Sequence, residues 1–200
     1  MSQIEYSVVL FGGGSVGKSC LLIQYLQGRF VAEYDPTVAE TYSKMMVFEN
    51  NPISIKLFDT AGQGEFQKLQ ENHFFTSEGF LLLFSLTSNS SFLEIVNIHK
   101  RILKFRVSPP CILVGNKCDL VDDRRVSLEE AENFAKKYNI SYFETSANTG
   151  KSVKPCFEKM LKLIKVLKEN GGIQKDLKKK VKAKKDKKKG KIDSGCCIIL

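Results

Sequence analysis

The chain has 200 residues, which is enough for one domain with a substantial core and a short appendage. Its net charge of +9 is unevenly distributed, because residues 1–174 hold 20 Lys and Arg against 19 Asp and Glu, while residues 175–200 hold 11 Lys against 3 Asp. This distribution excludes a folded domain that is basic throughout and assigns the excess charge to a C-terminal tail.

The chain lacks the sequence features expected of exported or membrane-spanning proteins. Its longest apolar runs, such as FLLLF at 80–84, are much shorter than the about 18 residues of a membrane helix. The N-terminal sequence MSQIEYS has neither a basic region nor an apolar stretch, so no signal peptide is expected. The six cysteines are scattered without metal-ligand spacing, which favours reduced thiols in the cytosol over three disulfides. His73 and His99 are isolated, and no catalytic role is predicted for them.

The first predicted unit is a strand, a glycine-rich turn and a helix. The apolar run YSVVLF at 6–11 predicts a strand, and the helical spacing of apolar residues in LLIQYLQ at 21–27 predicts a helix. Between them, FGGGSVGKSC at 11–20 matches the pattern G-x-x-x-x-G-K-[ST], in which backbone N–H groups surround phosphates. The residues that fix the pattern are Gly12, Gly17, Lys18 and Ser19. Because a helix N-terminus attracts anions, the sequence predicts a phosphate loop rather than a flexible turn.

A hairpin and two buried strands are predicted next. TYSKMMVFE at 41–49 and ISIKLFD at 53–59 flank the turn residues ENNP and predict a pair of antiparallel strands. GFLLLFS at 79–85 and CILVG at 111–115 are continuous apolar runs, as expected of strands that are covered on both faces.

The remaining periodicity predicts helices. SFLE at 91–94 and SLEE at 127–130 each place Ser three residues before Glu, which is typical of a helix start. A last helix is expected to bury one face, formed by Val153, Phe157, Met160, Leu161 and Ile164. A short strand is expected around Tyr142–Phe143. The alternation of strands and helices, with the phosphate loop after the first strand, predicts a three-layer α/β fold of the P-loop nucleotide-binding type, with a six-stranded, mostly parallel sheet, one antiparallel edge strand and about five helices.

Polar motifs follow several of these strands. Besides the phosphate loop, they are DTAGQ at 59–63, NKCD at 116–119 and ETSAN at 144–148. In such folds, ligands bind at the carboxyl ends of the strands, so the motifs are expected to meet there. Together with YDPT at 34–37, they resemble the motifs of Ras-family small GTPases. The resemblance extends over about residues 5–169 and includes the C-terminus.

This resemblance implies that the chain binds GTP or GDP with Mg²⁺. Lys18 would place its ammonium against the β- and γ-phosphates, Ser19 and Thr37 would ligate Mg²⁺, and Asp59 would hold the ion through water. Thr37 and Gly62 would each donate a backbone N–H to the γ-phosphate, so both contacts would exist only with the triphosphate. The phosphate-loop residues near the nucleotide would be Gly12, Gly14, Ser15, Val16, Gly17, Lys18, Ser19 and Cys20.

The resemblance also implies guanine recognition by Asn116, Lys117 and Asp119. A carboxylate can accept hydrogen bonds from the ring N–H and the exocyclic amine of guanine, and adenine lacks that pair of donors. Asn148 stands where Ras relatives usually carry Lys. The other residues expected at the base and ribose are Phe30, Val31, Asp35, Ser146 and Ala147.

Hydrolysis would depend on Gln63, which is expected to orient the attacking water. Gly14 would leave room for Gln63 and for an arginine inserted by an activating protein. The chain has no evident arginine for this role, so slow intrinsic hydrolysis is expected. Ras relatives mostly carry glycine at the position of Ser15, so the added side chain is expected to loosen the phosphate loop and speed GDP release.

The resemblance implies three classes of protein partner: guanine nucleotide exchange factors, GTPase-activating proteins and effectors. Ala39 and Gly64 replace acidic residues that are usual in Ras relatives, so the identity of these partners is open. The predicted effector loop consists of Tyr34, Asp35, Pro36, Thr37, Val38, Ala39, Glu40, Thr41 and Tyr42.

The C-terminal sequence predicts lipid modification. CIIL at 197–200 fits the motif for a prenyltransferase, and its last Leu favours a geranylgeranyl group on Cys197. A single lipid holds weakly, and the ten lysines between 178 and 191 would add attraction to anionic lipids. Cys196 is either palmitoylated or unmodified. A solvated or nuclear-targeting tail is the alternative to membrane attachment at the cytoplasmic face of the plasma membrane.

Three parts and three functions are therefore considered. The parts are a GTP-binding domain at 1–169, a flexible polybasic tail at 170–196 and the prenylation motif at 197–200. The favoured function is a membrane-anchored GTP/GDP switch that hydrolyses GTP in signal transduction. A slowly hydrolysing GTP-binding interaction module is disfavoured by the presence of Gln63 and Thr37. Nucleic-acid binding through the tail is disfavoured because no aromatic residues are interleaved with the lysines, so no nucleic-acid partner is expected.

Overall fold

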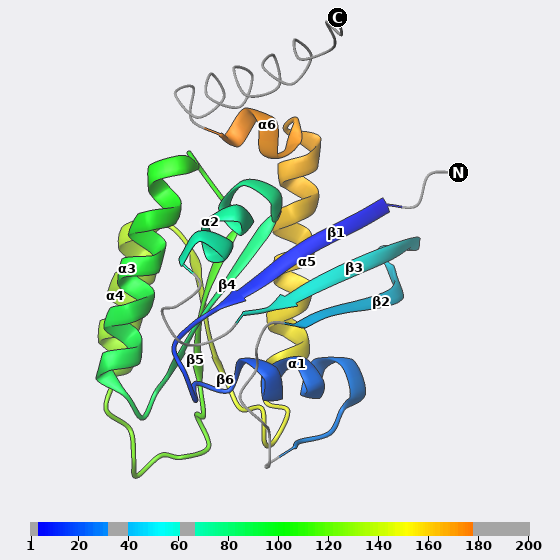
Figure 1. The fold of residues 1–200 in the computed structure, drawn as a ribbon. Coiled ribbons are helices and arrows are strands. Elements are labelled where there is room, and N and C mark those ends of the chain that lie inside the picture. Colours follow the sequence, from blue (N-terminus) through cyan, green and yellow to red (C-terminus); the bar gives the residue numbers. More distant parts are fainter. Residues whose placement is uncertain (1–3, 32–39, 61–66, 178–200) are drawn as a thin grey trace, which may run out of the picture.

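The structure is a computed structural model that describes residues 4–31, 40–60 and 67–177, with the backbone alone at 67–70. This described part holds one sheet flanked by helices (Figure 1). The strands are β1 (Ile4–Phe11), β2 (Glu40–Phe48), β3 (Asn51–Asp59), β4 (Gly79–Ser85), β5 (Cys111–Asn116) and β6 (Ser141–Thr145). The helices are α1 (Lys18–Gln27), α2 (Gln67–Thr76), α3 (Asn89–Phe105), α4 (Leu128–Tyr138), α5 (Val153–Glu169) and α6 (Gly172–Asp176). None of the helices in these ranges is both long and apolar enough to cross a bilayer.

The sheet has the strand order β2-β3-β1-β4-β5-β6 and confirms the predicted topology. All neighbouring strands are parallel except β2 and β3, which form the predicted hairpin at one edge. Glu49 and Asn50 connect these two strands with φ values of 47° and 64°. Two successive positive φ values suit the right-handed twist of a tight hairpin, and asparagine adopts them more easily than most residues.

The helices form two layers, one on each face of the sheet, as predicted (Figure 1). On one face, α1 and α5 pack against Tyr6, Val8 and Leu10 of β1. On the other face, Val9 and Phe11 pack with α2, α3 and α4. β4 and β5 are buried along their whole length because both of their faces are covered. The five apolar residues predicted to face inward from α5 are all buried.

The two predicted helix starts have different outcomes. Ser127 caps α4 as predicted, because its hydroxyl accepts a hydrogen bond from the N–H of Glu130 at 3.1 Å. The start predicted at Ser91 is wrong, since α3 begins at Asn89 and is capped by Ser88. Ser91 lies inside the first turn, where its hydroxyl accepts from the N–H of Ser85 at 3.0 Å. Ser88 has no Glu three residues later, so the pattern did not indicate it, and the contact of Ser91 with β4 gives Ser91 another role.

The packed part of the chain continues beyond the boundary predicted at residue 169. Residues 172–176 form α6, and Leu177 after it is 2% exposed. The buried carboxylate of Asp176 pairs with Arg106, which follows α3. The beginning of the segment predicted as a flexible tail is therefore attached to the domain.

Candidate functional site

The phosphate loop connects β1 to the N-terminus of α1, at the carboxyl ends of the central strands (Figure 1). Gly17 immediately precedes the helix with a φ of 91°. A Cβ at this position would lie 2.6 Å from Nδ2 of Asn116, which is closer than real Cβ contacts. The conformation and the close approach of Asn116 therefore both require glycine at position 17.

Lys18 is buried at the centre of this loop. Its ammonium donates hydrogen bonds to the carbonyl oxygens of Gly12 and Gly13, both at 2.9 Å, and the residue is 6% exposed. Burial lowers the pKa of Lys18, and the nearby carboxylates of Asp59 and Glu94 raise it in part. The loop thus holds a cation that is only partly neutralised, and bound phosphates would supply the missing negative charge.

Ser19 and Asp59 bring two oxygen ligands together beside Lys18. The hydroxyl of Ser19 donates a hydrogen bond to Oδ2 of Asp59, although the two residues belong to α1 and β3. Both are buried, at 8% and 1% exposure. Hydroxyl and carboxylate oxygens are ligands that Mg²⁺ accepts, so this pair fits the predicted metal site.

Ser15 adopts a backbone conformation that favours glycine. Its φ is 59°, in the left-handed region, and its side chain is exposed. For an L-residue with a Cβ this conformation costs about 1–2 kcal/mol. The phosphate loop therefore contains local strain that a glycine at this position would remove.

We expect Ser15→Gly to slow GDP release about tenfold, because removing about 1.4 kcal/mol of strain from the nucleotide-bound loop raises the barrier to release by that amount. Stopped-flow measurement with a fluorescent GDP tests the prediction. Ser15→Ala is the matched control, because it keeps the Cβ and removes only the hydroxyl, and it should release GDP like the wild type. Equal or faster release from the glycine variant would show that Ser15 does not strain the site.

Asn116, at the end of β5, connects the phosphate loop to the loop after β6. Its Nδ2 donates to the carbonyl oxygen of Val16 at 2.9 Å. Its Oδ1 accepts from the hydroxyl of Thr145 at 3.2 Å and from the N–H of Ala147 at 3.3 Å. Asn116 is fully buried, so these hydrogen bonds satisfy its amide without water. The sequence motif indicated a base contact but not this connecting role.

Asp119 lies where the loops after β5 and β6 meet. Nδ2 of Asn148 is 3.5 Å from Oδ2 of Asp119, and the side chain of Ser146 also bonds to the carboxylate. Burial by itself raises the pKa of Asp119, but the hydrogen bonds from Ser146, the backbone and Asn148 lower it below its ordinary value. The carboxylate is therefore ionised at neutral pH and can accept from two donors at once. Lys117, with a φ of 66°, precedes it in the same loop.

The residues predicted beside the ribose follow α1. The thiol of Cys20 lies 3.5 Å from the carbonyl oxygen of Val31, which ties the start of α1 to this segment. Phe30 is 44% exposed, so its ring is accessible to a base. Single exposed apolar side chains are common on protein surfaces, so the contact of Phe30 with a base stays a prediction.

Other predicted residues lie outside the described part of the chain. They are Tyr34, Asp35, Pro36, Thr37, Val38, Ala39, Gly62, Gln63, Cys196 and Cys197. Of the predicted effector loop, the structure describes Glu40, Thr41 and Tyr42, which lie at the start of edge strand β2. Gly14 is exposed, and a Cβ there would meet none of the described atoms within 4 Å, so its predicted effect depends on Gln63.

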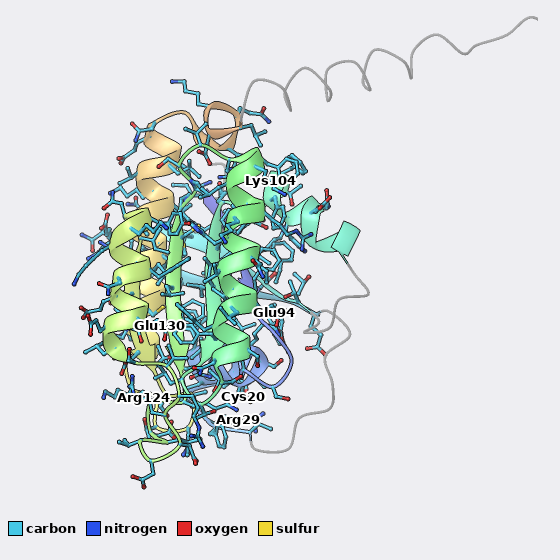
Figure 2. The ribbon with its side chains drawn as sticks, turned by 90° about the vertical axis from the view of Figure 1, so that its left-hand side faces the viewer. Cys20, Arg29, Glu94, Lys104, Arg124 and Glu130 are labelled. Carbon is cyan, nitrogen blue, oxygen red and sulfur yellow. The ribbon has the colours of Figure 1, made fainter. Side chains whose placement is uncertain are left out.

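Glu94 was not predicted as part of the site. It is labelled on α3 in Figure 2, and a Cβ at Gly13 would overlap its Oε2 atom. Burial raises the pKa of Glu94, and the ammonium of Lys18 lowers it in part. The sequence indicated only a helix-start role for this Glu, because nothing in the local pattern relates α3 to the phosphate loop.

Comparisons with known proteins agree with this geometry. A model of the Ras family matches residues 7–166. The chain is 40% identical to Ras-like protein 2 of Drosophila melanogaster, and the alignment covers 100% of each of the two proteins. It is 37% identical to Ras-like protein rasB of Dictyostelium discoideum, with 98% of each protein covered. It is 42% identical to Ras-like protein RAS2 of Hydra vulgaris, with 80% of this chain and 85% of that protein covered.

Proposed function

The chain belongs to the Ras family of small GTPases, which bind GTP or GDP with Mg²⁺, and we propose that it acts as a membrane-anchored switch in signal transduction. The observation that carries the nucleotide part of this proposal is the convergence of Lys18, the Ser19–Asp59 pair and Asp119 at the carboxyl ends of the strands. These residues supply a cation for phosphates, oxygen ligands for a metal and a carboxylate for guanine.

Each side chain has a separate task in this proposal. Lys18 holds the β- and γ-phosphates, Ser19 ligates Mg²⁺ and Asp59 positions the water around the ion. Mg²⁺, when bound, neutralises charge on the phosphate oxygens. Asn116 keeps the phosphate loop and the base-binding loops at a fixed separation.

The switch itself is assigned to residues on either side of these anchors. Thr37 and Gly62 bind the γ-phosphate through their backbone N–H groups, so the segments that contain them differ between the GTP and GDP forms. Gln63 orients the attacking water for hydrolysis. As in the Ras family generally, exchange factors, activating proteins and effectors are the expected partners.

Membrane anchoring rests on the C-terminal sequence. A prenyltransferase adds a geranylgeranyl group to Cys197, and the ten lysines from 178 to 191 strengthen attachment to anionic lipids. The proposed location is the cytoplasmic face of the plasma membrane. Stable anchoring needs both the geranylgeranyl group and the lysines, because a single lipid chain binds the membrane only weakly and reversibly.

Cys197→Ser tests this proposal. The variant is expected to move from the membrane fraction to the soluble fraction of cells that contain a prenyltransferase, because it cannot form the thioether. Cys196→Ser is the matched control, since it changes the adjacent cysteine but leaves the prenylation site intact. A Cys197→Ser variant that still fractionates with membranes would contradict lipid anchoring. Salt-sensitive binding of the lysine tail to RNA but not to anionic liposomes would favour the nucleic-acid alternative.

A further inference from the structure

A buried ion pair lies at the end of the domain opposite the phosphate loop. Arg106 is 0% exposed and Asp176 is 7% exposed, and Nε of Arg106 donates a hydrogen bond to Oδ2 of Asp176. Figure 2 shows Lys104, near the C-terminal end of α3, at this end of the molecule and Cys20 at the other. The ion pair is therefore remote from the predicted nucleotide site.

Arg106 also holds the C-terminal end of α2. Its Nη1 donates to the carbonyl oxygen of Phe74 at 3.1 Å and to that of Ser77 at 3.0 Å. Its guanidinium lies over the ring of Phe80, 5.3 Å from the ring centroid. Carbonyl groups at the end of a helix lack intrahelical donors and carry partial negative charge. Arg106 thus supplies the donors and the positive charge that complete the end of α2.

Asp176 fastens α6 to the segment that follows α3. Its Oδ1 accepts hydrogen bonds from the N–H groups of Val107 and Ser108, and its carbonyl oxygen accepts from Val107 at 2.8 Å. The next residue, Leu177, is buried and forms a β-bridge with Arg106. The carboxylate thus has a charged partner and two backbone donors.

The end of α2 and the docking of α6 depend on the same guanidinium. If α6 detaches, Arg106 becomes a buried charge without its carboxylate, which is strongly unfavourable. The guanidinium would then turn toward water, and the carbonyl groups at the end of α2 would lose their donor. The two contacts therefore support each other rather than contribute independently.

We propose that Arg106 and Asp176 are positioning residues that couple α6, at the start of the lysine-rich C-terminal region, to α2. In the sequence, α2 follows directly after residues 61–66, which contain the γ-phosphate-sensing Gly62 proposed above. The GDP and GTP forms hold α2 in different positions in this proposal. Because Arg106 contacts both elements, α6 then docks more tightly in one form than in the other. By thermodynamic reciprocity, the docking of α6 changes the relative affinities for GDP and GTP.

This coupling uses the proposed nucleotide switch but does not require lipid modification. Failure of the Cys197→Ser test would leave it unaffected. Loss of GTP binding altogether would instead overturn the proposed function. The two proposals can therefore fail separately.

Hydrogen exchange on the full-length protein tests the coupling. Asp176→Asn removes the carboxylate charge with little change in size. We expect it to speed exchange of the Leu177 amide just after α6 and of the Ser77 amide at the end of α2, each by about tenfold or more, as the loss of a hydrogen bond between charged groups allows. Glu169→Gln is the matched control, because it makes the same charge change at an exposed residue at the end of α5 and should leave both amides unchanged.

Two further measurements distinguish coupling from simple attachment of α6. The ratio of GTP to GDP affinity is expected to change at least about fivefold in Asp176→Asn and not in Glu169→Gln. The wild-type protein, which needs no substitution, should show different exchange at Leu177 when loaded with GDP and with a non-hydrolysable GTP analogue. If Asp176→Asn affects Leu177 alone, or if the two nucleotide forms of the wild type exchange identically, the pair only fastens α6 and the proposal is wrong.

Discussion

Replacing Asp119 with asparagine is expected to weaken GTP binding by about 10³-fold or more and to admit xanthosine triphosphate. The carboxylate, whose pKa is lowered further by hydrogen bonds from Ser146, the backbone and Asn148, is ionised and accepts from two donors of guanine in the proposed site. An amide turns one of these acceptors into a donor, and a site built around a hydrogen-bonding group rejects a mismatched partner by about 10⁴. Xanthine has an oxygen where guanine has its amine, so the amide restores a matching pair.

Competition between GTP and xanthosine triphosphate for each protein measures this reversal. Asp122→Asn is a suitable control, because it removes the same charge from an exposed residue in the following loop. It should bind GTP like the wild type. Unchanged GTP affinity in Asp119→Asn would remove Asp119 from base recognition.

Much of the fold follows from local patterns that the sequence displays directly. β4 and β5 are continuous apolar runs because helices cover both of their faces, and this burial leaves no room for alternating polar residues. The phosphate loop is recognisable because Gly17 and Lys18 are needed at fixed spacing for close backbone approach and charge. These features were predictable because each shows as a pattern within a few neighbouring residues, although distant helices and Asn116 supply the contacts that require it.

Features that depend on distant contacts were not predictable in the same way. Ser88 and Ser91 both suit a helix start, and the hydrogen bond of Ser91 with β4 decides between them. Arg106 and Asp176 lie 70 residues apart, and in the sequence Asp176 is one acidic residue beside a lysine-rich tail. Composition therefore predicted a solvated segment where the structure has a docked helix.

Asn116 was predictable in part, since its motif is visible in the local sequence but its hydrogen-bond partner Val16 lies 100 residues away. Asn116→Ala should lower the free energy of unfolding by about 3 kcal/mol, because it leaves the carbonyl of Val16 and the N–H of Ala147 buried without partners. It should also weaken GTP and GDP binding equally, by about 100-fold or more. Both nucleotides share the base, and each loss of 1.4 kcal/mol costs about tenfold in affinity.

Denaturant unfolding of the nucleotide-free protein separates this effect from that of Asp119. Asn116→Ala should lower the unfolding midpoint without nucleotide, because the hydrogen bonds it removes are internal to the protein. Asp119→Asn should leave that midpoint near the wild-type value, because Asp119 lies at the edge of the site and Asn116 at its centre. Thr145→Val, which removes a single donor to Asn116, should fall between them. If Asn116→Ala weakens nucleotide binding but unfolds like the wild type, Asn116 acts only through the base and does not hold the two loops together.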